Sequence, residues 1–131
     1  MKWANALSAV IDRVRGDPEI AAVLGGPHVY RAGEFRELRV PSIAYTIIVA
    51  SLEETTEPVR TQWDVFARNI DQLLTIERRL RRLLHWVGWK SVGGVMLSST
   101  YEDSRDHPSP DAPVLHRSLD FVHTPVRNRG W

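Results

Sequence analysis

The stretch NIDQLLTIERRLRRLLHWV, residues 69–87, decides the fold of this chain. Its apolar residues recur at steps of three and four, which predicts an α-helix with one apolar side. The other side carries Asp71 and several arginines, and Gly88 follows as a helix stop. Such a helix needs a flat apolar surface to cover. The segments before and after it are strand-like, so we expect that surface to be a sheet.

The residues before this helix predict two further helices. Residues 2–15 place their apolar side chains on one helical face, and Gly16 ends the pattern. Asp17 and Pro18 then provide a side-chain cap and a residue suited to the first helical position, which predicts a short helix over residues 19–24.

Five segments have the composition or the alternation of strands. A hairpin loop at residues 53–58 is expected between the second and third segments, and a glycine pair, Gly93 and Gly94, interrupts the fourth. The stretch 103–113 holds three prolines and is predicted as a long surface loop. The predicted strands are residues 27–30, 42–52, 59–67, 89–102 and 114–123.

This order of elements predicts an α+β domain. Strands joined by short polar loops pair antiparallel, and the long helix crosses over one face of the sheet. We therefore expect a mostly antiparallel sheet of four to five strands, with the two main helices packed on one face. Residues 1–123 are assigned to this single domain and residues 124–131 to a short basic tail.

The overall composition excludes several classes of function. The 131 residues carry a net charge of +1, which gives no general attraction to nucleic acid or to a membrane surface. The absence of cysteine excludes disulfides, a Cys-ligated zinc site and a thiol nucleophile. No apolar run approaches the roughly 20 residues of a membrane helix. A charged N-terminal segment, with Asp12 and Arg13, does not fit a secretion signal.

The densest charge cluster is the arginine run of the long helix. It is either a solvated helix face with intrahelical pairs such as Glu77 with Arg81, or a docking face for an acidic protein partner or nucleic acid. The near-neutral chain disfavours nucleic acid. Trp86, predicted on the polar side of this helix, and Trp131 in the tail are aromatic residues in wet positions. They indicate either contact with another chain or ordinary scattered apolar surface.

No motif in the sequence indicates catalysis, a cofactor or a bound metal. The histidines lack HxH or HExxH spacing, and His116 and His123 are an odd number of residues apart, so they should point to opposite faces of one strand. We expect isolated histidines, no metal and no cofactor. Ser98 and Ser99 lie near Asp103, Asp106 and His107, but no nucleophile elbow surrounds them, so an enzyme is not expected. The five histidines are His28, His85, His107, His116 and His123.

Four segments in order carry a resemblance to a known family. After an N-terminal helix come AAVLGGPHVYRAG (21–33), PSIAYTIIVA (41–50), TQWDVFARN (61–69), which runs into the long helix, and LHRSLDFVHTP (115–125). With these segments in this order, the chain resembles the tail terminator, or tail completion, proteins of long-tailed bacteriophages. The likeness is a pattern of elements over nearly the whole chain, and the loop at 103–113 departs from the shortest members.

The resemblance implies a structural role in the virion. Such proteins form a ring, typically a homohexamer, on the last ring of tail-tube protein, end tube growth and offer the surface that joins the head–tail connector. DNA passes through the lumen without sequence-specific contacts, and the family has no catalytic residues to carry over. The chain would then lie in the tail or neck of the virion, and in the host cytoplasm during assembly.

The expected contacts with other subunits or neighbouring rings fall on three segments: the hairpin loop at 53–58, the arginine face of the long helix (Arg78, Arg79 and Arg82) and the tail at 124–131. Another neck protein is the alternative within this class. A small nucleic-acid-binding module that uses the basic helix face is the alternative from another class. The candidate interface residues are Glu53, Glu54, Glu57, Arg78, Arg79, Arg82, Arg127, Arg129 and Trp131.

Overall fold

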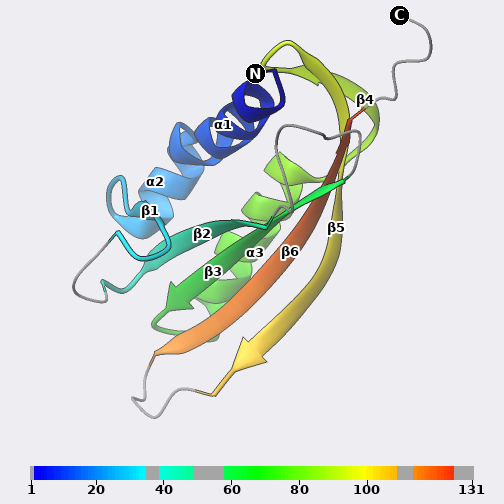
Figure 1. Ribbon diagram of the computed structural model, residues 1–131. Coiled ribbons are helices and arrows are strands. Elements are labelled where there is room, and N and C mark those ends of the chain that lie inside the picture. The colour runs from blue at the N-terminus through cyan, green and yellow to red at the C-terminus, as the bar shows by residue number, and fades with distance from the viewer. Residues whose placement is uncertain (1, 35–38, 49–57, 109–113, 126–131) are drawn as a thin grey trace, which may run out of the picture.

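The computed structural model describes residues 2–34, 39–48, 58–108 and 114–125. Within these ranges the chain forms three helices and six strands (Figure 1). The helices are α1 (Lys2–Arg15), α2 (Pro18–Leu24) and α3 (Ile70–Leu84). The strands are β1 (Val29–Arg31), β2 (Ser42–Ile48), β3 (Val59–Ala67), β4 (Trp86–Val92), β5 (Val95–His107) and β6 (Leu115–Pro125).

The strands form one mixed sheet in the order β1-β2-β3-β6-β5-β4. β1 pairs with β2 in parallel, and the other neighbours are antiparallel. The α+β class is confirmed, but the expected four to five strands are corrected to six. The stretch predicted as one strand over 89–102 is two strands, because Gly93 and Gly94, both at positive φ, turn the chain between β4 and β5.

The helix α3 begins as predicted and ends earlier. The Asn69 side chain caps it by accepting a hydrogen bond from the backbone N–H of Gln72 at 2.8 Å. The helix stops at Leu84, and His85 is already extended. Trp86 and Gly88 therefore lie in β4, which corrects their predicted places on the polar side of the helix and just past its end.

The predicted loop at 103–113 is also corrected. Its first five residues extend β5, which pairs with β6 as far as the partners His107 and His116. This strand tolerates its charges because they pair across the sheet: Arg105 contacts Asp120 at 2.6 Å. Residues 109–113 of the predicted loop lie outside the described residues.

All three helices gather on one side of the sheet, with α3 across β3 and β6 (Figure 1). Their apolar faces meet the inner face of the sheet, where Trp63, Phe121 and Leu80 are fully buried. The two main helices therefore share one face, as predicted, and α2 joins them there. None of the described helices is long and apolar enough to cross a membrane.

A line of polar groups runs through this core. The Trp63 indole N–H donates to Thr61 Oγ1 at 2.9 Å, and Thr61 Oγ1 lies 2.7 Å from His123 Nε2. On the other side of the imidazole, Nδ1 lies 2.8 Å from Ser99 Oγ, and this hydroxyl donates to the Leu84 carbonyl. The polar groups of this line are therefore paired with one another and with the end of α3.

Candidate functional site

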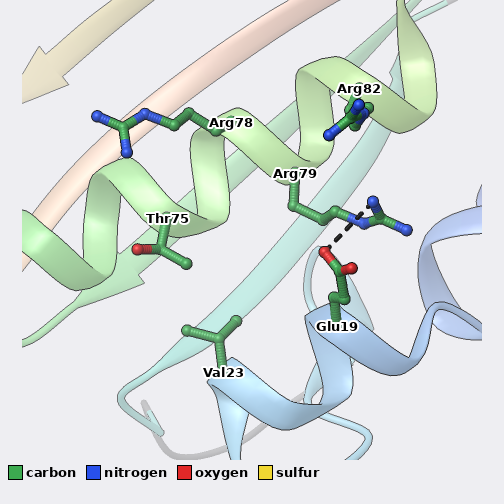
Figure 2. Close-up of a pocket in the computed structure, with 6 residues that line it drawn as sticks. All are labelled: Glu19, Val23, Thr75, Arg78, Arg79 and Arg82. Atoms are coloured by element: carbon green, nitrogen blue, oxygen red, sulfur yellow. Dashed lines mark ion pairs between the residues drawn. The ribbon is translucent and has the colours of Figure 1, made fainter.

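A hollow of about 180 Å³ lies between α2 and α3. It opens on the exposed side of the two helices, away from the sheet (Figure 2). We call it the arginine hollow, because three of its lining residues are arginines. The lining residues are Glu19, Val23, Thr75, Arg78, Arg79 and Arg82.

Arg79 is held inside the chain rather than offered to a partner. Its guanidinium makes two hydrogen bonds to the Asp17 carboxylate, at 2.6 and 2.9 Å, and lies 3.3 Å from Glu19 (Figure 2). The hydrogen bond from Arg79 holds the pKa of the buried Asp17 carboxyl below its ordinary value. Asp17 also caps α2 by accepting from the Ile20 N–H at 3.0 Å. Arg79 therefore fastens α2 to α3.

Arg78 and Arg82 are exposed on the same helix. In Figure 2 the Arg78 guanidinium points away from Glu19, along α3. Within the described part of the chain neither residue forms an ion pair. The predicted pair of Glu77 with Arg81 is present at 3.8 Å. The uncompensated positive charge of the arginine face therefore comes from Arg78 and Arg82.

The sheet face opposite the helices is polar and densely hydrogen-bonded. Asp64 on β3 lies beside His116 and Ser118 on β6, with 2.8 Å between Asp64 Oδ1 and His116 Nε2. His107 at the end of β5 stacks on His116, with ring centroids 4.3 Å apart. We call Asp64, His107, His116 and Ser118 the histidine cluster.

The histidine cluster corrects the expectation that all the histidines are isolated. The prediction that His116 and His123 point to opposite faces is confirmed, since His123 is buried under the helices. The sequence predicts a loop at His107, so it gives no sign that this residue pairs with His116. Alternation within one strand shows which face a residue takes, but only the register between strands shows which residues meet.

The electrostatics of the cluster favour a charged carboxylate. Burial alone would raise the pKa of Asp64, but hydrogen bonds from Ser118, His116 and Gln62 outweigh it and hold this pKa below its ordinary value. The carboxylate is therefore an acceptor with its charge in place at neutral pH.

The edge strand β4 carries exposed apolar side chains. The strand is irregular between Trp86 and Lys90, where its register with β5 shifts. Val87 and Trp89 lie in that irregularity and are 96% and 53% exposed. Apolar side chains exposed together on an edge strand are a candidate contact surface. We call this feature the β4 edge.

The serine constellation considered from the sequence is not assembled. Ser99 is fully buried and bonds His123 in the core. His107 lies at the far end of β5, where its Nε2 is 2.7 Å from Ser118 Oγ, and Asp106 pairs with Arg117 at 2.6 Å. Ser98 and Asp103 are placed on β5. Six predicted interface residues lie outside the described residues: Glu53, Glu54, Glu57, Arg127, Arg129 and Trp131.

Comparison with known proteins gives a clear answer for the fold. No family model matches the chain, and no curated protein sequence matches it. A solved structure does match: a chain from the virion of a native gene transfer agent particle, with a TM-score of 0.71 at 18% sequence identity. The alignment covers 94% of this chain and 96% of the other. The two chains share a fold.

That likeness covers the whole described architecture. Because nearly all of both chains is aligned, the common unit is the complete α+β domain rather than one supersecondary motif. At such low identity the agreement concerns the path of the backbone. What the arginine hollow, the histidine cluster and the β4 edge do must be argued from their own chemistry.

Proposed function

We propose that this chain is a structural protein of a phage-like virion, and that it acts as the tail terminator that caps the tail tube. The observation that carries the proposal is the fold shared, end to end, with a chain of a gene transfer agent virion. The order of segments that resembles tail terminator proteins points to the same role. The site of action is the tail or neck of the particle, reached by assembly in the host cytoplasm.

In this role the chain forms a ring, a homohexamer in the family it resembles, on the last ring of tail-tube protein. A closed ring needs two unlike surfaces on each subunit that meet head to tail. The β4 edge fits one of these two surfaces, and the arginine hollow remains for a partner outside the ring. Figure 1 places β4 at one edge of the sheet and α2 towards the other, so they can face different neighbours.

The two surfaces suit different partners. The β4 edge offers Val87 and Trp89 for apolar contact, which fits the repeated contact between subunits. Arg78 and Arg82 are exposed and form no ion pair with the described residues, so their positive charge fits acidic groups of the tail-tube protein or the head–tail connector. DNA passing through the lumen needs no specific contact in this scheme.

The test is an assembly reaction followed by electron microscopy. The purified chain is mixed with tail-tube protein of the same particle, and tube length and end structure are recorded. Capped tubes of limited length, with a ring at one end, are expected. A chain that neither forms rings nor binds the tube under these conditions contradicts the proposal.

Variants then locate the charged contact. Arg78→Glu with Arg82→Glu reverses the two unpaired charges and should abolish binding to the acidic partner without lowering the melting temperature, because neither residue forms an ion pair among the described residues. Arg78→Lys with Arg82→Lys keeps the charge and should retain binding. If the reversed protein still assembles, the arginine face is only solvated surface.

A further inference from the structure

The histidine cluster brings three metal-ligating side chains from three strands to one point. Asp64 lies on β3, His107 on β5 and His116 on β6. One carboxylate oxygen and one ring nitrogen from each histidine lie within 4.8 Å of one another. The three side chains are half-buried rather than enclosed, so an ion can reach them from solvent.

The donor set specifies the kind of ion. Two imidazole nitrogens with one carboxylate oxygen are typical ligands of zinc and of similar divalent transition metals, whereas magnesium and calcium prefer oxygen alone. We propose that Asp64, His107 and His116 bind a divalent transition-metal ion of the zinc class. Three protein ligands leave at least one coordination position for water or for a group from a neighbouring molecule.

The distances within the cluster are close to those of a metal site. Zinc–ligand bonds of about 2.1 Å place two ligand atoms no more than about 4.2 Å apart. Asp64 Oδ1 and His116 Nε2 are already at 2.8 Å, and the widest separation in the cluster is below 4.8 Å. Binding therefore requires a rearrangement of the three side chains.

The surroundings of the cluster orient its ligands. The strand register sets His107 directly opposite His116, and Phe66 opposite His116 on the other side. The Phe66 ring stacks on the His116 ring with centroids 4.3 Å apart. Ser118 contacts both Asp64 Oδ1 and His107 Nε2. Ligands carried on paired strands, with the His116 ring held by stacking, are preorganised for an ion.

The competing explanation is a hydrogen-bonded network that needs no ion. In that network His116 Nε2 donates to Asp64, and Ser118 bridges Asp64 and His107. Binding replaces these contacts, because a ligating nitrogen must present its lone pair rather than a proton. The metal site predicts stoichiometric affinity for zinc, and the hydrogen-bonded network predicts none. This difference can be measured whether or not the chain forms rings.

The experiment is calorimetric titration of the full chain, without a histidine tag and freed of metal by chelation, with zinc chloride. We expect one ion per chain. His107→Ala and His116→Ala should each abolish stoichiometric binding, whereas Ser118→Ala, which removes a hydroxyl that competes for His107 Nε2 and Asp64 Oδ1, should not weaken it. His28→Ala, which removes a half-buried histidine outside the cluster, should bind as the unaltered chain does.

A second readout keeps the test independent of folding defects. Cobalt(II) chloride added to the unaltered chain should give visible absorption bands of a histidine-ligated ion, and these bands should be absent in His107→Ala, whose fold is checked by circular dichroism. The proposal is overturned if the unaltered chain binds no zinc. It is equally overturned if zinc binds but His107→Ala and His116→Ala bind it as tightly.

Discussion

The hydrogen bonds around His123 determine where its proton lies. Ser99 donates its hydroxyl hydrogen to the Leu84 carbonyl, so its oxygen must accept from His123 Nδ1. Thr61 accepts from the Trp63 indole, so its own hydrogen is available for His123 Nε2. This assignment follows from the donors and acceptors rather than from observed hydrogens. It requires a neutral imidazole with the proton on Nδ1.

Stability should therefore depend on pH through His123. Burial lowers the pKa of His123 from 6.5 to about 4. Between these values the unfolded chain binds a proton that the folded chain does not, so the free energy of unfolding falls as the pH is lowered from 6.5 towards 4. About 1.4 kcal/mol is lost per pH unit, or about 3 kcal/mol in total.

Urea unfolding between pH 4 and pH 7.5 measures this slope. His123→Gln removes the titrating group and should flatten the curve across the window, whatever its absolute stability. The lowered pKa values of Asp17, Asp64 and Asp106 act in a separate window, below about 3.8, because their contribution is lost only as these carboxylates protonate. If the slope is unchanged in His123→Gln, the lowered pKa of His123 is not the cause of the pH dependence.

At the scale of elements, the end of α3 shows what the sequence cannot reveal. The carbonyls of its last turn are satisfied from elsewhere: Leu83 accepts from Arg13 of α1 at 3.3 Å, and Leu84 accepts from Ser99 of β5. The apolar period continues to Val87 in the sequence, but these tertiary bonds end the helix at Leu84. The start was predictable, because Asn69 caps through a local bond.

The β4–β5 turn was predictable only in part, because its glycines are local in the sequence but its contact with α1 is not. A glycine pair indicates a turn or a bulge, and the turn is observed. Which glycine is essential depends on α1, a distant segment. A Cβ on Gly93 would lie 2.6 Å from the Asn5 carbonyl oxygen, whereas a Cβ on Gly94 would meet nothing within 4 Å.

Alanine substitutions should separate the two glycines. Both residues have positive φ, +58° and +82°, so each substitution should cost about 1–2 kcal/mol of backbone strain. Gly93→Ala should cost more than Gly94→Ala, because backbone atoms of α1 must also move away from the turn. Urea unfolding gives the difference, and faster amide exchange in α1 of the Gly93 variant would locate it. Equal losses of unfolding free energy in the two variants would show that α1 moves away from the turn at no measurable cost.

At the scale of the whole molecule, the sequence predicted the class and missed the size of the sheet. Period-two alternation identified β3, and segment order identified the helical side. The tip of the β5–β6 hairpin was missed because charged residues there pair across strands, as Arg117 does with Asp106. The candidate surfaces also differ in how far the sequence predicts them. The arginines were predictable because they lie on one helix, whereas the histidine cluster depends on the register of three strands.

The β4 edge gives a prediction about assembly. An edge strand exposes unpaired backbone groups, and natural edges are usually protected by charge or by irregular backbone. Here the irregular segment carries two exposed apolar side chains, Val87 and Trp89, and a single basic residue, Lys90. We expect this edge to bind the neighbouring subunit in the proposed ring.

Val87→Lys with Trp89→Lys should therefore prevent ring formation on the tail tube while leaving the melting temperature nearly unchanged, because both side chains are exposed in the single chain. Light scattering of the chain with tail-tube protein, with electron microscopy of the products, measures the loss. Ile70→Lys is the matched control. Ile70 is also an exposed apolar residue, 51% exposed, and it lies at the first residue of α3, at the opposite end of this helix from β4. Rings formed equally well by all three proteins would show that subunits meet through a different surface. Loss in the Ile70 variant as well would show that the assembly responds to added charge in general, and the β4 edge would no longer be distinguished.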